Sequence, residues 1–150
     1  MKDARAFTVD DVRILDLKQV NTSEGGAIVS CEKSDLLPFD PKRVYYLYDV
    51  PSGADRGGHA HKQLQQLMVA VSGSFEVVIN DGKTEKTIRL DQPNQGLYFP
   101  PGLWRELKGF SGGAICLVLA SEDYNEEDYI RTIAEFANWK ESGNERSKFE

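Results

Sequence analysis

The stretch that decides the fold reads Gly53-Ala-Asp-Arg-Gly-Gly-His59-Ala-His61-Lys-Gln-Leu-Gln-Gln66-Leu-Met-Val-Ala-Val-Ser-Gly73. It holds both of the histidines that occur among the 150 residues of the chain. On a β-strand, residues i and i+2 project from the same face of the sheet. We therefore expect His59 and His61 to lie on one side of a sheet, close enough to reach one small molecule.

Short strands are predicted on both sides of this stretch, since β-branched and aromatic residues alternate there between glycine- and proline-containing turns. They cover residues 12–20, 27–32, 43–50, 75–80, 83–90, 96–101, 104–107 and 114–121. Asp81-Gly82 predicts a two-residue hairpin, because a type I′ turn needs positive φ at both positions. In strand 43–50, even-numbered residues share one face and odd-numbered residues, including Tyr45, share the other. Strands so closely spaced favour a closed antiparallel sheet, either a barrel or a jelly roll.

A single helix is predicted at residues 125–141. Asn125 can cap its N-terminus, the acidic residues 126–128 suit the positive end of the helix dipole, and Gly143 suits a C-terminal cap. The apolar stripe of this helix is expected to pack on the core. The acids of its first turn are interpreted as solvated capping residues and not as catalytic carboxylates.

Length and composition indicate one domain over residues 1–150, since 40% of the residues are apolar and can bury a single core. A net charge of −6, with no cluster of Lys and Arg, argues against a nucleic-acid partner. No run of 18 apolar residues occurs, so no membrane span is expected. With two cysteines and no apolar signal segment, Cys31 and Cys116 are expected to be unpaired and the chain to be cytoplasmic.

Two motifs resemble the signatures of the cupins, a superfamily of jelly-roll proteins. They read Gly53-x5-His59-x-His61-x4-Gln66-x6-Gly73 and Pro100-Pro-Gly-Leu-Trp-Arg105. The resemblance implies an all-β, cupin-type jelly roll, a double-stranded β-helix barrel, with the one C-terminal helix added. Metal-dependent cupins place a glutamate ligand where this chain has Gln66, and a third histidine where it has Arg105.

These two replacements predict a site without metal. Iron and manganese sites combine imidazoles with a carboxylate, and here the carboxylate is replaced by an amide and a permanent cation is added. A guanidinium about 5 Å from a divalent ion costs on the order of 6 to 7 kcal/mol at an effective dielectric constant of 20. We therefore expect no bound metal ion.

Further motifs, between about residue 43 and residue 130, resemble the nucleotide-sugar 3,4-ketoisomerases, small cupins of deoxyaminosugar biosynthesis. They are Arg43-Val-Tyr-Tyr, Arg56-Gly-Gly-His-Ala-His-Lys62, Gly96-Leu-Tyr98, Trp104-Arg-Glu106 and Leu119-Ala-Ser-Glu-x-Tyr-x-Glu-x-Asp-Tyr-Ile-Arg131. The resemblance implies a dTDP-4-keto-6-deoxyhexose substrate that is isomerised to the 3-keto sugar without a cofactor. It also implies a homodimer that exchanges N-terminal strands, within residues 1–40.

The residues present suit this chemistry. Moving a carbonyl from C4 to C3 requires removal of the C3 proton, an enediol or enediolate, and return of a proton to C4; a neutral imidazole is a suitable base at pH 7. By similarity to the family, His59 is predicted to be this base, with His61 as a second proton carrier or orienting group. Arg105 or the hydroxyl of Tyr45 is predicted to stabilise the negative charge of the enediolate.

Substrate contacts are predicted for five further side chains. Arg56 and Lys62 are candidates for the diphosphate, which favours basic partners. Gln66 is a candidate for a hydrogen bond to a sugar hydroxyl or to a histidine. Tyr98 and Trp104 are candidates to pack on a sugar or thymine ring.

Three other functions stay open from the residues alone. The first is a 3,5-epimerase acting on the same nucleotide sugar, which needs a proton donor on the opposite face of the ring and its own histidine–aspartate pair. The second is a metal-dependent cupin oxygenase. The third is a sugar-binding or regulatory cupin without catalytic activity.

Overall fold

The computed structural model describes residues 2–34 and 36–149, and only the backbone of residues 56, 57 and 144–149. The strands are β1 (Arg13–Asp16), β2 (Lys18–Asn21), β3 (Ala27–Ser30), β4 (Arg43–Leu47), β5 (Arg56–His61), β6 (Gln66–Ser72), β7 (Phe75–Asn80), β8 (Glu85–Leu90), β9 (Gln95–Phe99), β10 (Trp104–Lys108), β11 (Ile115–Ala120) and β12 (Tyr129–Ile130). The helices are the short 3₁₀ helices η1 (Ala4–Ala6), η2 (Val9–Asp11) and η3 (Glu126–Asp128), and α1 (Ile133–Phe149).

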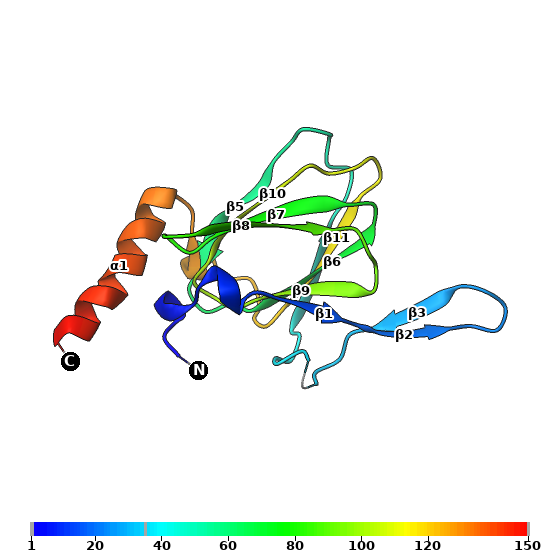
Figure 1. Ribbon diagram of the computed structural model, residues 1–150, viewed down its shortest axis with the longest axis horizontal. Helices are drawn as coiled ribbons and strands as arrows, with labels where there is room; N and C mark the ends of the chain where they lie inside the picture. The colour runs from blue at the N-terminus through cyan, green and yellow to red at the C-terminus, as the bar shows by residue number, and fades with distance from the viewer. Residues whose placement is uncertain (1, 35, 150) are drawn as a thin grey trace.

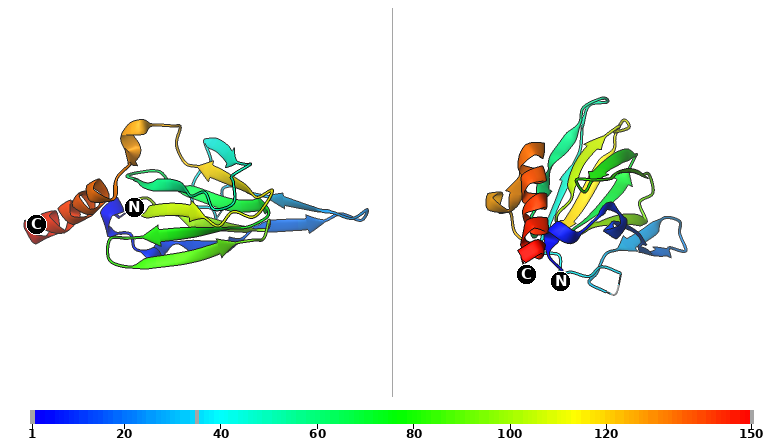
Figure 2. Two further views of the ribbon diagram at one scale, coloured as in Figure 1. Left: turned by 90° about the horizontal axis from the view of Figure 1, so that it is seen from above. Right: turned by 60° about the vertical axis from the view of Figure 1, so that its left-hand side comes forward.

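Two antiparallel sheets of five strands each form the body of the molecule (Figure 1). Their strand orders are β1-β9-β6-β11-β4 and β12-β5-β10-β7-β8. The β2–β3 hairpin extends beyond one end of this body, and α1 lies at the other end (Figures 1 and 2). The predicted all-β jelly roll with a C-terminal helix is therefore confirmed.

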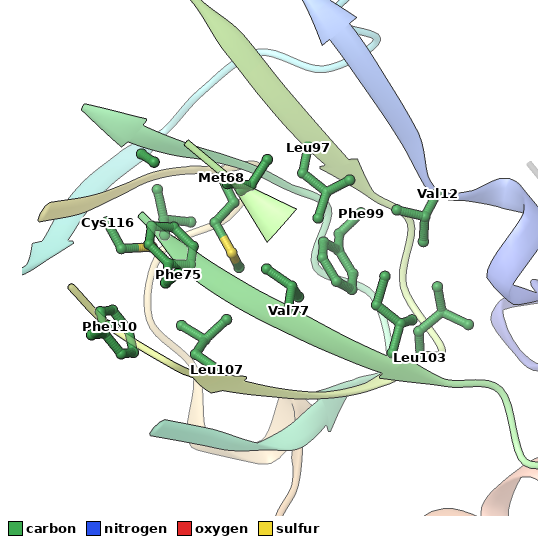
Figure 3. Packing of buried hydrophobic residues seen from close by; sticks show 14 of the residues in the cluster. Val12, Met68, Phe75, Val77, Leu97, Phe99, Leu103, Leu107, Phe110 and Cys116 are labelled. Carbon is green, nitrogen blue, oxygen red and sulfur yellow. The ribbon is translucent and has the colours of Figure 1, made fainter. Parts of the chain in front are cut away.

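The core fills the space between the two sheets (Figure 3). Strand β7 shows why: Phe75, Val77 and Ile79 are fully buried, while the residues between them are only partly buried. Leu97 and Phe99 of β9 meet them from the other sheet. Burial of each such side chain contributes roughly 1.5 to 3 kcal/mol, so this alternation of buried and partly buried residues fixes the register of the sandwich.

The outer faces of the two sheets are covered by different segments. Leu37 and Phe39, in the segment after the hairpin, pack on Leu67 of β6. On the other sheet, Phe136 of α1 packs on Trp104 of β10, with 6.0 Å between the ring centroids. The sheet side chains that pack under these segments point away from the space between the sheets. Two predicted site residues, Tyr98 and Trp104, are among them.

Strand 43–50 behaves as its alternation predicts, although β4 ends at Leu47. Val44 and Tyr46 are 57% and 60% exposed on the outer face. Arg43, Tyr45 and Leu47 turn toward the inside of the sandwich. The odd-numbered face of this strand is thus the one that can contribute to a site.

The Asp81-Gly82 signal correctly places a hairpin between β7 and β8, but the predicted two-residue turn is wrong. Asn80 pairs with Glu85, and only Gly82 of this loop has positive φ (95°). The Asp81 carboxylate explains the longer loop, because it accepts hydrogen bonds from the backbone of Lys83 and Thr84 within the loop. A second error lies in strand 12–20, which is divided at Leu17 into β1 and β2.

The predicted helix 125–141 is displaced: α1 begins at Ile133 and ends at Phe149. Asn125 does cap a helix, but the helix is the short η3. The chain then becomes extended, because Tyr129 and Ile130 pair with the edge of β5. Gly143 lies inside α1 and not at a cap. A glycine suits this position because a Cβ here would come within 2.5 Å of Arg5 Cδ.

Cys31 and Cys116 are free thiols, as predicted. Within the described part of the chain, no helix is long and apolar enough to cross a membrane.

Candidate active site

A cavity of about 320 Å³ lies between the two sheets and opens to solvent. Three of the residues predicted to be catalytic, Tyr45, His59 and Arg105, line it together. The complete lining is Arg43, Tyr45 and Leu47 of β4, His59 of β5, Met68 of β6, Arg105 and Leu107 of β10, Val118 of β11, Tyr129 of β12, and Arg131.

His59 projects into this cavity from β5, directly opposite Arg105 of the neighbouring strand β10. Its Nε2 atom is buried and has no hydrogen-bond partner among the described residues. Burial, and then the positive charge of Arg105, lower the pKa of His59 to about 2. The imidazole is therefore neutral at pH 7, so that one of its ring nitrogens carries a free lone pair.

His61 lies behind His59 and does not line the cavity. Its side chain is only 1% exposed, and its ring meets that of His59 nearly at right angles, with centroids 4.9 Å apart. The Nδ1 atom lies 2.9 Å from Oδ2 of Asp128. Burial and the charge of Arg105 lower the pKa of His61 to about 4, against the opposing effect of Asp128.

A chain of hydrogen bonds joins Arg105, Gln66 and Tyr45. Arg105 is buried and donates from its guanidinium to Oε1 of Gln66. Nε2 of Gln66 donates in turn to the hydroxyl of Tyr45, at 2.8 Å. Because this hydroxyl accepts a hydrogen bond from Gln66, its own proton is free to be donated into the cavity. Gln66 thus orients the two predicted stabilisers of negative charge and not a histidine, and its predicted contact with a sugar hydroxyl stays a prediction.

Two further arginines stand at the cavity. The guanidinium of Arg43 lies 5.3 Å from the Tyr45 ring, and its buried Nε has no hydrogen-bond partner within residues 2–34 and 36–149. Arg131 lies 4.1 Å over the ring of Tyr129 and binds Glu126 through two hydrogen bonds of 2.8 and 2.7 Å. The cavity is therefore bordered by positive charge, which suits an anionic ligand.

Three predicted substrate contacts are not brought to the cavity. Trp104 precedes Arg105 on β10 and points to the opposite face, against Phe136. Tyr98 also points to the outer face of its sheet, where it packs under the segment after the hairpin and donates a 2.6 Å hydrogen bond to Gln65. Lys62 is exposed and its amine lies 3.3 Å from the carbonyl oxygen of Glu127. The predicted Arg56 contact falls on a side chain outside the described residues.

The interpretation of residues 126–128 as solvated caps is wrong for Asp128, whose side chain is only 13% exposed. Its carboxylate is drawn inward, because η3 is followed by the pairing of β12 with β5. Tyr129 and Arg131 reach the cavity by the same route. Their spacing of two residues, on one face of an extended segment, was an available sequence signal. Arg43 could have been found as well, since it shares the odd-numbered face of its strand with Tyr45.

The residues around His59 do not fit a bound divalent metal ion. The positions of a carboxylate and a third imidazole in the cupin signature hold Gln66 and Arg105, which are joined by a hydrogen bond. Among the described residues, no group of three or more His, Cys, Asp or Glu side chains could hold one ion. A guanidinium in the site also repels a cation.

Comparison with known proteins shows the family to which this chain belongs. Residues 10–141 match the family described as FdtA: WxcM-like, C-terminal. The TDP-4-oxo-6-deoxy-alpha-D-glucose-3,4-oxoisomerase of Aneurinibacillus thermoaerophilus is 39% identical over 127 residues, which cover 85% of this chain and 91% of that protein. The match confirms the resemblance that the motifs indicated.

Solved structures agree. A 3,4-ketoisomerase from Helicobacter canadensis is 43% identical, with a TM-score of 0.83 over 87% of this chain and 98% of the other. The sugar 3,4-ketoisomerase QdtA from Thermoanaerobacterium thermosaccharolyticum, solved in complex with TDP, is 36% identical, with a TM-score of 0.85 over 89% and 97%. A variant of QdtA is solved in complex with TDP-4-keto-6-deoxyglucose. The chain therefore belongs to the FdtA family, the sugar-nucleotide 3,4-ketoisomerases that are built on a cupin-type jelly roll.

Proposed function

We propose that this 3,4-ketoisomerase acts on a dTDP-4-keto-6-deoxyhexose and that the imidazole of His59 carries the proton between C3 and C4. The observation that carries the proposal is that His59 lines one cavity together with Arg105 and Tyr45, and that its Nε2 has no hydrogen-bond partner among the described residues. The substrates named for the relatives support the choice of nucleotide and sugar.

The reaction follows from this arrangement. His59 takes the proton from C3, and the electron pair of that C–H bond forms the C3–C4 double bond while the carbonyl π electrons move to O4. The enediolate is stabilised by the hydroxyl of Tyr45 and the charge of Arg105. The hydroxyl proton then passes from O3 to O4, and the imidazolium of His59 returns its proton to C4, leaving a carbonyl at C3. Every group of the protein ends in its starting state, so no cofactor is consumed.

Substrate binding raises the basicity of His59. In the free enzyme, burial and nearby cations hold its pKa at about 2. The diphosphate of the substrate and the developing enediolate bring negative charge to this cavity, and negative charge favours the protonated imidazole. The imidazolium is thus stabilised at the stage of the reaction in which it forms.

Arg43 and Arg131 are the proposed partners of the diphosphate. Both line the cavity, and the buried Nε of Arg43 has no hydrogen-bond partner in the described part of the chain. Planar guanidinium groups bind phosphate oxygens through paired hydrogen bonds. Lys62 is not needed for this role, since its amine lies beside the carbonyl oxygen of Glu127.

A product analysis in heavy water tests the reaction. Incubation with dTDP-4-keto-6-deoxyglucose, followed by proton NMR, is expected to show a 3-keto sugar that carries deuterium at C4 wherever the imidazolium has exchanged with solvent. Labelling at C3 and C5 without a 3-keto product would instead identify a 3,5-epimerase. The His61–Asp128 pair is of the kind an epimerase uses, but the cavity is lined by His59.

A variant separates catalysis from binding. We expect His59→Asn to lose turnover by about 10² to 10⁴-fold, the usual contribution of a general base, and to keep its affinity for dTDP in calorimetry. Lys62→Gln is the matched control, since it also changes a polar side chain next to the histidine pair, and it should keep wild-type turnover. Wild-type turnover in His59→Asn would contradict the proposal.

We also propose a homodimer in which the N-terminal hairpin of each protomer packs on the other. The β2–β3 hairpin protrudes from the body (Figure 2) and exposes Val20 and Ile28 by 50% and 58%. A lone two-stranded hairpin is only marginally stable in water. Tyr46 and Tyr48, 60% and 63% exposed beside β4, offer an apolar surface that such a hairpin can cover.

The dimer is tested by light scattering on size-separated protein. Ile28→Lys is expected to shift the mass toward that of the monomer, since it places a charge in the contact. Ile133→Lys is the matched control: this isoleucine is also 54% exposed, but it lies on α1 at the far end of the molecule. A wild-type protein that is monomeric at micromolar concentration would contradict the dimer.

Given its nucleotide-sugar substrate and free thiols, we propose that the enzyme is cytoplasmic.

A further inference from the structure

The carboxylate of Asp128 is held in place on both of its oxygens. Oδ1 accepts a 2.7 Å hydrogen bond from the backbone N–H of Gln63, and Oδ2 lies 2.9 Å from Nδ1 of His61. The backbone of Asp128 is also held, because its carbonyl oxygen accepts a hydrogen bond from the N–H of Lys62, at 3.0 Å. Asp128 therefore has one orientation relative to the histidine strand.

This contact fixes the tautomer of His61. Burial raises the pKa of the Asp128 carboxyl, but the hydrogen bond and charge of His61, together with the backbone donors, outweigh burial and hold the pKa below its ordinary value. An ionised carboxylate only accepts hydrogen bonds. Nδ1 of His61 must therefore carry the proton, and Nε2 keeps the lone pair.

The ring of His61 transmits this orientation to the cavity. It packs against His59 with 4.9 Å between the ring centroids, and against Tyr129 with 4.4 Å. Both of these neighbours line the cavity, whereas His61 itself is 1% exposed. Its Nε2 has no hydrogen-bond partner among the described residues, so the bond to Asp128 is the polar contact that holds this ring.

We propose that Asp128 is a positioning residue for the isomerisation, acting through His61: it locks the ring and the Nδ1–H tautomer of His61, and thereby sets the orientation of the His59 imidazole against the substrate. The inference rests on the proposed role of His59 and adds a residue, 67 positions along the chain from His61, to the machinery of the reaction. Asp128 does not line the cavity.

Asp128→Asn tests the idea at one atom. The backbone N–H of Gln63 needs an acceptor, so the amide oxygen of the new side chain stays with it and the amide NH₂ faces His61. Nδ1 of His61 must then accept, and the proton moves to Nε2. In ¹⁵N spectra of histidine-labelled protein, we expect a protonated Nδ1 in the wild type and a protonated Nε2 in the variant.

The kinetic expectation is a fall in kcat of about 10 to 100-fold, the cost known for groups that orient the histidines of metal sites, with KM little changed. Glu127→Gln removes the same charge from the neighbouring, exposed position and should keep both the wild-type tautomer and kcat. In a double-mutant cycle, Asp128→Asn should add little to His61→Asn, because the two residues act as one unit.

Three results would overturn the inference: an unprotonated Nδ1 of His61 in the wild type, an inverted tautomer in Asp128→Asn with kcat unchanged, or additive effects in the cycle. The wild-type spectrum needs no variant, so a poorly folded Asp128→Asn still leaves the tautomer measurable. A wild-type enzyme without isomerase activity would refute the proposed function, whereas the tautomer is read without turnover.

Discussion

Acid should destabilise this protein through its two histidines well before its carboxylates titrate. Burial and the charge of Arg105 lower the pKa of His59 to about 2 and that of His61 to about 4, against about 6.5 in an unfolded chain. Below pH 6.5 the unfolded state therefore binds protons that the folded state refuses, and the free energy of unfolding falls as the pH drops from 6.5 toward 4. At pH 5.0 the loss is about 2 kcal/mol for each histidine, or about 4 kcal/mol together.

Urea denaturation at pH 7.0 and pH 5.0, at one protein concentration, measures this loss. The chain has no other histidine, and ordinary carboxyl groups in an unfolded chain titrate below about pH 4.5, so the window belongs to these two rings. The wild type should lose about 4 kcal/mol and His61→Asn only about 2 kcal/mol, since one titrating ring remains. A flat profile between the two pH values, or an equal loss in the variant, would refute the assignment of both rings as buried and neutral.

Three substitutions test other parts of the site. Tyr45→Phe should lower kcat by about 10²-fold, as for other donors to a developing oxyanion, while calorimetry shows unchanged binding of dTDP; an unaltered kcat would remove this hydroxyl from the reaction. Trp104→Ala should lower the free energy of unfolding by about 3 to 5 kcal/mol and leave KM unchanged, because the ring packs under α1; a raised KM would return it to the substrate site. Gln66→Glu combined with Arg105→His should restore a carboxylate and a third imidazole, so elemental analysis should find about one divalent metal ion per chain where the wild type binds none, and a metal-free double variant would contradict the account of these two positions.

Local alternation explains why much of the fold and part of the site could be predicted from the sequence. A period of two residues along a strand decides which side chains share a face. It places Arg43 with Tyr45, and His59 with His61, without any knowledge of the partner strands. The same rule could have excluded Trp104, because its neighbour Arg105 points into the cavity.

The inward position of the Asp128 carboxylate could not be predicted from the sequence. A capping asparagine followed by three acids is typical of a helix start, and the structure does contain a short helix there. What turns the last acid inward is the pairing of Tyr129 and Ile130 with the edge of β5, a contact across more than 60 residues of chain. Local propensity carries no information about such a partner, and the two paired residues are too few to form a recognisable strand pattern.

Electrostatics explains why this site has Gln66 and Arg105 where metal-dependent cupins have a glutamate and a third histidine. The Arg105 guanidinium is buried, and it donates a hydrogen bond to the neutral amide of Gln66. A glutamate there would pair with the cation and cancel much of its field. Holding the cation with a neutral group leaves its charge available, at a desolvation cost that the folded protein must offset. The Arg105 guanidinium gains a negatively charged partner only when the enediolate forms. Its charge therefore stabilises the transition state more than the bound ketone, which is the condition for catalysis.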